Sequence, residues 1–461
     1  MRNDTATFSS AREKAQPRSK YGLYAICFGF FLVLLDTSAL NVAIVAMQRE
    51  FGGAINGLQW VVNSYTIVFA SFLLACGAVA DRFGAKLCYQ LGLLLFTAMS
   101  LASALSPGIG FLIGARSFQG LGAAVMLPAS LAALSHAYPN PEERGHAISF
   151  WAGVVSMGFA AGPALGGILT NYFGWRAIFW INVPTGVLAL AMVYKFIGES
   201  RESAPRHIDV AGQGSAAAAL FVLSYGLITA GTAGWLAPRV LIAFGAAVLL
   251  ILALVRFEKK SAAPVLPPSL FSNTVFSVSI AMGVVLNFGM YGTLFIESIF
   301  LQDVLHLNAL AAGLMILPFT AFPTIATRVA ARYSGRKHVL PRLIAGQLVA
   351  AAGSAILALT LGFSGYWAIL LGLALGGIAM GVAMPAMTTG VLISSETYNS
   401  GLASGILNSA RQVGGALGVA LMGTLVQSLN RRGMLLSFAI AIAVYLAMTG
   451  ATLRAYSRRT T

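Results

Sequence analysis

An aspartate and an arginine each interrupt a long apolar run near the start of the chain. Asp36 follows the stretch FFLVLL, and Arg116 lies within GFLIGARSFQG. A charged side chain in such a run is costly unless it faces a partner or a water-filled cavity. A carboxylate that alternates between dry and wet surroundings binds and releases a proton, because burial disfavours its charged form. We therefore predict proton coupling by Asp36, tuned by Arg116. The alternative is an Asp36 held permanently in a salt bridge, for instance with Arg116.

Other polar side chains within the apolar runs are candidates for lining a substrate cavity. Gln119 shares a helical face with Arg116, because residues three apart in a helix lie on the same side. Glu297 lies near the outer end of its run, where a solvated acid at the membrane boundary is the alternative. Arg411 either pairs with an acid or faces the cavity. The expected cavity residues are Asn41, Asn63, Tyr65, Gln119, Asn287, Tyr291, Glu297 and Arg411.

The stretch GAVADRFGAK is a short basic segment that contains one acid. Asp81 can accept hydrogen bonds from the N-terminus of a helix, where the helix dipole favours negative charge. Gly84 permits a tight turn. The alternative is an ordinary basic loop, which needs the positive charges but not the acid. We predict a cytoplasmic gate loop formed by Gly77, Asp81, Arg82, Gly84 and Lys86.

The stretch GFAAGPALGG repeats glycine at every fourth position. In a helix these glycines form a stripe without side chains, and the proline permits a bend. Close packing of membrane helices is a sufficient explanation of such a stripe. The alternative is a functional motif, formed by Gly158, Gly162, Pro163, Gly166 and Gly167.

The sequence contains no cluster of the residue types that enzymes and metal sites need. Cys27, Cys76 and Cys88 lie in or beside apolar runs without metal-ligand spacing. The five histidines lie in or beside expected loops, and no phosphate-binding loop occurs. We expect no enzyme activity, no metal and no cofactor, with a proton gradient as the energy source.

Composition dictates the elements that hold these residues. Of the 461 residues, 58% are hydrophobic and 9% are charged, whereas soluble proteins have about 25% charged residues. The mean hydropathy is +0.81. A helix of about 20 apolar residues crosses a bilayer, and this length divides the chain into fourteen spans. Their approximate cores are 22–46, 58–80, 88–106, 110–133, 147–169, 175–197, 209–230, 236–255, 274–300, 310–331, 340–361, 366–388, 402–426 and 433–453.

Basic residues are divided unevenly between the two ends of these spans. With the N-terminus inside, twenty-two Lys and Arg residues lie on the inner side and five on the outer side. Cytoplasmic loops of membrane proteins are enriched in Lys and Arg, so both termini are predicted to be cytoplasmic. The net charge of +15 is scattered in short clusters, which does not favour nucleic-acid binding.

Three short stretches recur in the same order in the second half of the chain. The pairs are ADRFGAK with ARYSGRK at 80–86 and 331–337, GLGAAVMLPA with GIAMGVAMPA at 120–129 and 377–386, and GPALGG with GGALGV at 162–167 and 414–419. The copies are eight spans apart, which predicts two parallel six-helix bundles and two inserted helices. Parallel repeats around a midplane site are a transporter architecture. The expected parts are a cytoplasmic tail at 1–20, a bundle at 21–200, the inserted pair with linkers at 201–260, a bundle at 261–455 and a tail at 456–461.

Seven separate stretches, in the expected order, resemble the fourteen-span drug:proton antiporters of the EmrB/QacA type in the major facilitator superfamily. Besides the two motifs above they include LLDTSALNVAI, LQWVVNSYT, RSFQGLGAA, WRAIFWINVPTG and ASGILNSARQVGGALGVALMG. The resemblance covers roughly residues 22–453. The loop at 77–86 resembles the superfamily's signature loop, with Ala85 in place of a usual basic residue. The stripe at 158–167 resembles its antiporter signature. The resemblance implies an all-α integral membrane protein with the major facilitator fold, in which Asp81 meets a helix N-terminus near Ser400 and Gly401.

The same resemblance implies a function. A member of this family exports drugs, antibiotics or other small hydrophobic or cationic compounds across the cytoplasmic (inner) membrane, in exchange for protons. The expected partners are the small-molecule substrate, protons and the lipid bilayer, without nucleic acid; the sequence does not specify a periplasmic adaptor. Alternatives are an exporter of an endogenous metabolite or lipid, and a proton-coupled symporter of a small solute. A symporter would lack the glycine and proline signature of the fifth span.

Overall fold

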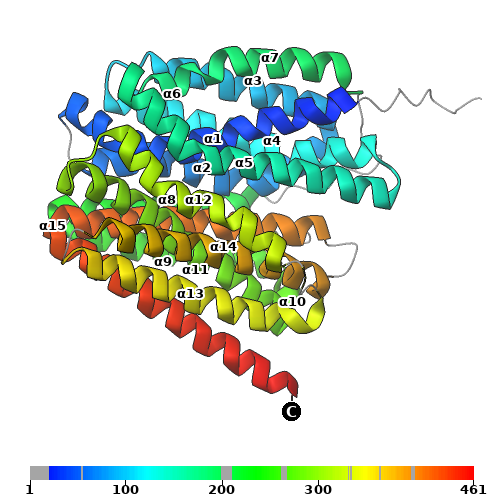
Figure 1. The fold of residues 1–461 in the computed structure, drawn as a ribbon. Coiled ribbons are helices and arrows are strands. Elements are labelled where there is room, and N and C mark those ends of the chain that lie inside the picture. The colour runs from blue at the N-terminus through cyan, green and yellow to red at the C-terminus, as the bar shows by residue number, and fades with distance from the viewer. Residues whose placement is uncertain are drawn as a thin grey trace, which may run out of the picture.

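The computed structural model describes residues 20–52, 55–198, 210–260, 267–330, 332, 335–362, 365–395 and 400–460. Every regular element in these ranges is a helix, and most helices run side by side along one direction (Figure 1). Helices are expected for apolar runs of this length, because a backbone in lipid must satisfy its hydrogen bonds internally. The predicted all-α membrane fold is confirmed.

The N-terminal part of the chain forms one bundle. Asn140 begins one of its helices by accepting a hydrogen bond from the backbone N–H of Glu142, with Pro141 in the first turn, a common way to start a helix. The sixth predicted span is divided at Ile181 into a short and a longer helix. The helices are α1 (Lys20–Phe51), α2 (Ile55–Phe83), α3 (Ala85–Ala104), α4 (Ile109–Ala137), α5 (Pro141–Phe173), α6 (Ala177–Trp180) and α7 (Asn182–Phe196).

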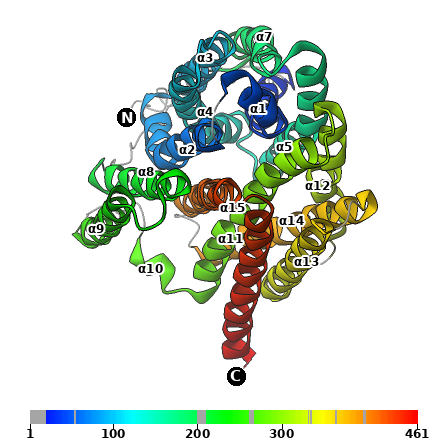
Figure 2. The ribbon, with the colours of Figure 1, turned by 90° about the vertical axis from the view of Figure 1, so that its left-hand side faces the viewer.

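Two helices follow that belong to neither bundle. They are α8 (Val210–Ala233) and α9 (Pro238–Lys260), which pack against each other. Helix α8 also contacts α2 and α15, and Figure 2 shows the pair at the edge of the molecule beside these two helices. These are the two inserted helices that the sequence predicts.

The C-terminal part forms the second bundle. Its elements are α10 (Pro268–Phe271), α11 (Thr274–Ile299), the π-helical turn η1 (Phe300–Val304), α12 (Ala309–Ala330), the 3₁₀ turn η3 (Arg336–His338), α13 (Val339–Thr360), α14 (Tyr366–Ser394) and α15 (Ser400–Thr460). Helix α15 has 61 residues and is interrupted at Asn430, where φ is 51° and ψ is −125°. It therefore consists of two helices joined at a kink.

The number of spans follows from these lengths. In the described part of the chain, thirteen helices are long and apolar enough to cross a membrane. The last, Leu402–Ala455, has 54 residues, about 80 Å of helix, whereas the hydrocarbon layer is about 30 Å thick. Its two halves on either side of the kink raise the number of spans to fourteen, as predicted.

The two bundles repeat one packing pattern. In the first, α1 packs on α5 and α7, and α4 packs on α2 and α3. In the second, α11 packs on α15, and α14 packs on α12 and α13. The contacts between the bundles are also related, since α5 meets α12 and α2 meets α15. We call these two contacts the seam. The parallel repeat read from three short sequence matches is therefore a repeat of three-dimensional packing.

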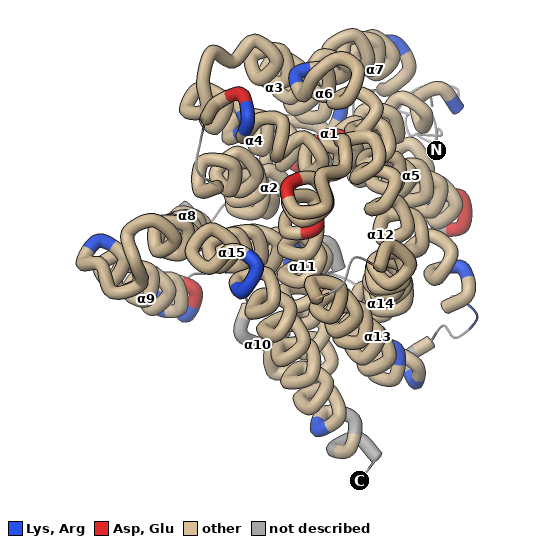
Figure 3. Tube along the Cα trace, turned by 60° about the vertical axis from the view of Figure 1, so that its left-hand side comes forward, with Lys and Arg blue, Asp and Glu red and all other residues tan. Residues whose placement is uncertain are grey.

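Charge is sparse along the helices. Figure 3 shows most of the chain in the colour of uncharged residues, with the charged positions mainly toward helix ends and connections. This distribution fits a protein whose flanks face lipid. Exceptions include Asp36, Arg116 and Glu297, which are buried in the interior.

Candidate functional site

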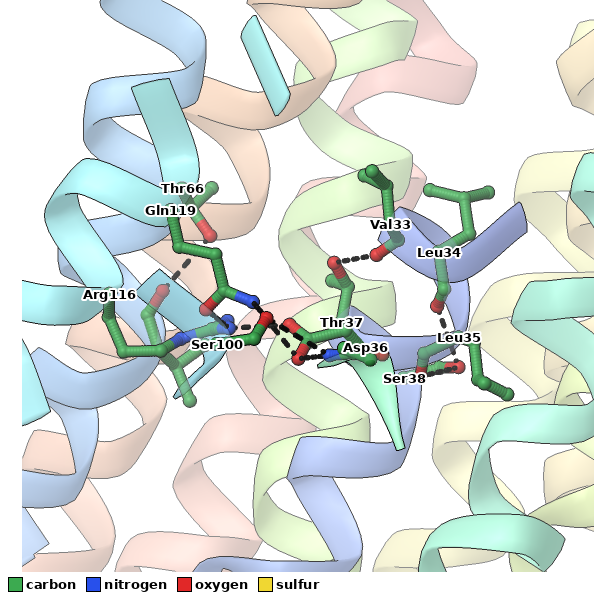
Figure 4. Close-up of polar contacts among 12 residues, drawn as sticks. Val33, Leu34, Leu35, Asp36, Thr37, Ser38, Thr66, Ser100, Arg116 and Gln119 are labelled. Atoms are coloured by element: carbon green, nitrogen blue, oxygen red, sulfur yellow. Dashed lines mark hydrogen bonds and ion pairs between the residues drawn. The ribbon is translucent and has the colours of Figure 1, made fainter. Parts of the chain in front are cut away.

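Asp36 and Arg116 meet inside the N-terminal bundle. Arg116 Nη1 donates to Asp36 Oδ2 at 2.5 Å, and the two side chains are 0% and 1% exposed. Figure 4 shows Arg116 reaching from α4 toward Asp36 on α1. The salt bridge that the sequence left as an alternative is thus present in this conformation.

Three neutral side chains complete a hydrogen-bonded cluster around the pair. Asn182 Nδ2 and Gln119 Nε2 donate to Asp36 Oδ1 at 2.9 and 3.3 Å. Gln119 Nε2 also donates to Ser100 Oγ at 2.7 Å, and Gln119 Oε1 accepts from Arg116 at 2.6 Å. The two carboxylate oxygens therefore have different partners: Oδ2 binds the cation, and Oδ1 binds the amides. We call Asp36, Ser100, Arg116, Gln119 and Asn182 the acid cluster.

The guanidinium of Arg116 is also held by aromatic rings. Its carbon lies 4.4 Å from the ring centre of Tyr65 on α2 and 5.7 Å from that of Phe179, within the range of cation–π attraction. Gly120, one turn after Arg116, packs on the backbone oxygen of Tyr65, and a Cβ at this position would collide with it. The arginine thus connects the acid of α1 to helix α2.

The glycine stripe of α5 packs against α1. A Cβ placed on Gly158 would lie 2.6 Å from the carbonyl oxygen of Phe31, and one on Gly162 would collide with Ser38 Oγ. Gly166 is equally close to the backbone of α1. The stripe lets the two backbones approach, as small residues do between membrane helices. Ser38 lies two residues beyond Asp36, so the stripe contacts the helix that carries the acid.

The other side of the same motif contacts α12 across the seam. A Cβ on Gly167 would lie 2.7 Å from the carbonyl oxygen of Ala309, and Gly313 packs directly on the carbonyl oxygen of Pro163. Helix α5 is therefore held between α1 of its own bundle and α12 of the other. The motif is a junction of three helices and not a contact of two.

A hydrogen bond reinforces this junction. Thr320 Oγ1 on α12 donates to the carbonyl oxygen of Ala160 on α5 at 3.1 Å. Pro163 has no N–H, so the carbonyl oxygen of Phe159, four residues earlier, lacks its helical partner. Thr320 thus binds the turn of α5 that the proline interrupts.

The gate loop is a one-residue turn. Helix α2 ends at Phe83, α3 begins at Ala85, and Gly84 between them has φ of 104°. Only glycine adopts this backbone without strain, as expected. Lys86 Nζ donates to the carbonyl oxygen of Tyr194 on α7 at 3.1 Å. This lysine connects the turn to the end of the sixth span.

The remaining gate residues lie on the last turns of α2. Gly77 packs toward Pro128 of α4, with 3.7 Å from an added Cβ to the proline Cβ. Asp81 is half-buried and Arg82 is exposed. The side chains of Ser400 and Gly401 lie outside the described residues, so the expected contact of Asp81 with this helix start stays a prediction.

The eight expected cavity residues are distributed over several places. Tyr65 and Gln119 belong to the surroundings of Arg116. Asn41 lies where α1 meets α11, since Ser298 Oγ donates to its carbonyl oxygen. Asn63 on α2 is fully buried, and neither polar atom of its amide has a hydrogen-bond partner.

The remaining cavity residues lie on α11 and α15 of the C-terminal bundle. Asn287 Nδ2 donates to the carbonyl oxygen of Gly283 at 2.9 Å, and a Cβ on Gly283 would lie 3.3 Å from Arg411 Cγ. Gly415 packs on the ring of Tyr291. Arg411 is half-buried and contacts Asn408 Oδ1 at 3.3 Å, and no acid is recorded as its ion-pair partner in the described chain.

Glu297 is buried and not a solvated boundary acid. Glu297 is 1% exposed, and its Oε2 atom has no hydrogen-bond partner. The next residue, Ser298, binds the backbone of α1 across the bundle boundary. The position near a helix end suggested solvent, but the neighbouring bundle covers this end.

Most of the chain matches one known family. The model of the Major Facilitator Superfamily matches residues 26–419. The chain belongs to the Major Facilitator Superfamily. Members of this superfamily move small molecules across membranes, so the protein is a multi-pass transporter and not an enzyme.

Curated relatives of this facilitator are similar over most of their length. A methylenomycin A resistance protein of Bacillus subtilis (strain 168) is 36% identical over 412 residues, covering 88% of this chain and 87% of the relative. A protein of the same name from Streptomyces coelicolor is 33% identical, covering 92% and 89%. A tetracenomycin C resistance and export protein of Streptomyces glaucescens is 33% identical, covering 88% and 76%.

Solved structures also resemble this facilitator. The crystal structure of a peptide transporter, POT, in complex with sulfate has a TM-score of 0.72 and 15% sequence identity. The match covers 95% of this chain and 94% of the other. At this identity the likeness concerns the fold alone, and it agrees with the repeated packing described above.

Two members of the acid cluster in this facilitator were not predicted. Ser100 lies in an apolar run of α3 where a single serine attracts no notice, and Asn182 lies in WRAIFWINVPTG, which resembles a boundary anchor. The signal for Asn182 was an amide within an apolar stretch, two residues before a proline. Trp175 at the start of the same stretch is 3% exposed and its indole N–H binds Glu50, so this tryptophan is buried, whereas Trp180 is exposed.

Proposed function

We propose that this protein is a proton-coupled efflux antiporter that exports antibiotics or other small hydrophobic or cationic compounds by alternating access. The names of the relatives, which state methylenomycin A resistance and tetracenomycin C export, support an antibiotic substrate. The observation that carries the proposal is the fully buried pair of Asp36 and Arg116. A buried charge pair is a poor way to gain stability, and intramembrane charges mark ion and substrate pathways.

The geometry of the pair supports competition between a proton and a cation. Arg116 occupies Oδ2 of Asp36, whereas the amides of Gln119 and Asn182 occupy Oδ1. A proton that binds Oδ2 displaces the guanidinium. Proton binding and release by Asp36 therefore move Arg116, and a cationic substrate that reaches the carboxylate competes in the same way.

Two series of contacts connect Asp36 to the seam. Arg116 is stacked on Tyr65 of α2, the helix that faces α15. Ser38, two residues after Asp36, lies against Gly162 of α5, the helix that faces α12. A change of charge at Asp36 thus acts on both contacts between the bundles. We propose that this couples protonation to the rocking of one bundle against the other.

Buried polar atoms without partners support a polar path between the bundles. Such atoms normally have a hydrogen-bond partner in protein or water, so a substrate or water is expected to satisfy them during transport. In the described chain these atoms include Asn41 Oδ1, both amide atoms of Asn63, Glu297 Oε2 and Arg411 Nε.

The orientation is proposed from charge. The excess of Lys and Arg on one end of the spans supports cytoplasmic N- and C-termini in a bacterial-type cytoplasmic membrane. In this orientation the GAVADRFGAK turn lies on the cytoplasmic side, where Gly77, Asp81, Arg82, Gly84 and Lys86 act as a gate. The residue boundaries expected for the tails, bundles and inserted pair stay part of this proposal.

The proposal is tested with everted membrane vesicles that hold a pH gradient. Addition of methylenomycin A or tetracenomycin C is expected to dissipate the gradient in vesicles with the wild-type protein. Asp36→Asn should insert in the membrane at the same level and leave the gradient intact, because the amide cannot exchange a proton. Asp303→Asn is the matched control, since Asp303 is a partly exposed acid that pairs with Arg49 at 3.6 Å.

The outcomes separate the candidate functions. Wild-type dissipation by Asp36→Asn would remove that acid from the coupling step. A gradient that no antibiotic dissipates, together with unchanged drug susceptibility of an overexpressing strain, would favour an endogenous metabolite or lipid as the substrate. Uptake of a solute with the proton gradient would identify a symporter.

A further inference from the structure

The second copy of the gate loop keeps the turn of the first and reverses its charge. Gly335 has φ of 114°, close to the 104° of Gly84 in the first copy. Arg332 occupies the position that corresponds to Asp81, and Arg336 adds another positive charge. The turn is therefore conserved between the two halves, but the acid that could bind a helix N-terminus is lost.

Helices α12, α13 and α14 themselves offer this positive charge no acid, whereas α5, which packs on α12, carries Glu142 and Glu143 in its first turn. The sequence contains no Asp or Glu between Asp303 and Glu396, the stretch that includes all of α12, α13 and α14. At the loop end of these helices the described side chains are exposed or half-buried. They are Arg328, Arg332, Lys337 and Arg342. A cluster of this kind next to a membrane attracts an anion from outside the chain.

An apolar groove begins beside this cluster. It has a volume of about 600 Å³, in the usual range of ligand pockets of about 300–1,000 Å³. Its walls come from the last turns of α12, the first turns of α13 and the middle of α14. The lining is apolar except for His338 and Arg342, which both lie at the loop end.

Arg342 is placed to bind an anion at the mouth of the groove. Its Nη2 makes one long hydrogen bond, 3.4 Å to the carbonyl oxygen of Val382, and its buried Nε has no partner. It lies in the first turn of α13, where the helix dipole favours negative charge.

The depth of the groove matches one leaflet of a bilayer. On α12 the lining runs from Phe322 to Ala330, about 12 Å along a helix, and half of the hydrocarbon layer is about 15 Å. An occupant with a charged end at Arg342 and an apolar body of this length fits better than a compact solute.

We propose that this groove binds an anionic phospholipid of the leaflet on the loop side, which is the cytoplasmic leaflet in the proposed orientation. The phosphate lies at Arg342 and the first turn of α13, and one acyl chain fills the space between α12, α13 and α14. The inference goes beyond export and does not require it.

Lipid retention by the purified full-length chain tests the proposal. Native mass spectrometry compares phosphatidylglycerol with phosphatidylcholine of the same acyl chains, and glycerol phosphate serves as a headgroup without chains. The wild-type protein should retain phosphatidylglycerol about fivefold to tenfold better than phosphatidylcholine, as expected for one or two cationic contacts. Glycerol phosphate alone should not be retained.

Two variants separate the charge from the groove. Arg342→Gln should lower phosphatidylglycerol retention to the phosphatidylcholine level. Its control is Arg239→Gln, because Arg239 also follows a proline in the first turn of a helix, α9, and is exposed. Ala345→Trp should fill the groove and lower retention of both lipids. Its control is Ala352→Trp, an exposed alanine seven residues further on the same face of α13 and outside the groove.

The results that overturn the proposal are equal retention of the two lipids by the wild-type protein, or full phosphatidylglycerol retention by Arg342→Gln or Ala345→Trp. Displacement of the lipid by methylenomycin A or tetracenomycin C would instead make the groove a site for the transported compound. A monodisperse elution and an unchanged melting temperature of each variant exclude misfolding as the cause. None of these readouts depends on proton coupling, so export and lipid binding fail or hold separately.

Discussion

The acid cluster places side chains from three other helices around one carboxylate. Arg116 and Gln119 come from α4 and Asn182 from the start of α7, and all three donate to Asp36. Ser100 of α3 accepts from both amides. A buried oxygen that loses its hydrogen-bond partner is costly, so the neutral amides hold Asp36 Oδ1 in place, although neither amide is charged.

Asn182→Ala tests this role of the amide. The change removes one donor to Asp36 Oδ1, a hydrogen bond to a charged group of about 1.5–3 kcal/mol. Because Asp36 Oδ1 then lacks this donor, the carboxylate is held less firmly beside Arg116. The initial rate of drug-driven gradient dissipation in everted vesicles should fall about tenfold, since about 1.4 kcal/mol is a factor of ten in rate.

Gln347→Ala is the control for this prediction. Gln347 is also a buried amide, but its Nε2 contacts Met282 and Thr452 within the C-terminal bundle. Its removal should leave the rate of gradient dissipation unchanged. If both variants lower the rate equally, the effect of Asn182 is not specific to the acid cluster.

At the scale of elements, α5 joins α1 of its own bundle to α12 of the other. Its glycine stripe faces α1, and its proline turn faces α12. The second half repeats the stripe, since Gly414 and Gly418 of α15 pack on the backbone of α11 at Val284 and Phe288. Packing thus explains the stripe in both halves. Packing of the stripe does not explain the contact of α5 with α12, which includes the hydrogen bond from Thr320.

Gly158→Ala is expected to separate α1 from α5. The new Cβ would lie 2.6 Å from the carbonyl oxygen of Phe31, and a backbone atom cannot move aside as a side chain can. Overpacking of this kind costs about 1–3 kcal/mol, so the melting temperature of the purified protein should fall.

Gly153→Ala on the same helix provides the control. A Cβ at Gly153 meets nothing within 4 Å, and alanine favours a helix over glycine by about 1 kcal/mol. This variant should melt at the same temperature or higher. An equal loss of stability in the two variants would contradict the steric explanation.

At the scale of the whole molecule, the bundles are joined by hydrogen bonds at the end where α1 finishes and α2 begins. Gln59 Nε2 on α2 donates to the carbonyl oxygens of Val419 and Ala420 at 3.0 and 2.8 Å. Gln302 Nε2 donates to the carbonyl oxygen of Val42 at 2.9 Å. In the proposed orientation this is the outer end, so the conformation described here is closed toward the outside.

Gln59→Ala should shift the molecule toward an outward-open state. The change removes two hydrogen bonds of about 1 kcal/mol each, which enlarges the open population by a factor of about 30. Spin labels at Gly110→Cys and Arg432→Cys, both exposed at the outer ends of the two bundles, should then report a longer distance.

Gln347→Ala is the matched control for this shift. Gln347 is also a buried glutamine, but its Nε2 contacts Met282 and Thr452 within the C-terminal bundle. It should lower stability without changing the distance between the labels. An unchanged distance in Gln59→Ala would show that the outer hydrogen bonds do not hold the closed state.

The sequence by itself determined the class of protein, the fourteen spans and the repeated halves. These features are local, because a run of about 20 apolar residues must be a helix in lipid wherever it occurs. The need for a glycine at the turn between α2 and α3 was local as well. Each short match to the superfamily lies within a single span or loop. The superfamily could therefore be identified without knowing how the helices pack.

Only the tertiary structure decided which side chains meet. Asp36 lies 80 residues from Arg116 and 146 from Asn182 in the sequence, and periodicity within one helix gives no information about partners on others. For the same reason the sequence left open whether Glu297, near the end of its own helix, is a cavity residue or a solvated boundary acid, and the structure shows it buried. Burial in a bundle depends on which helices pack together, and packing is set by the shapes of many faces at once and not by any one stretch of the chain.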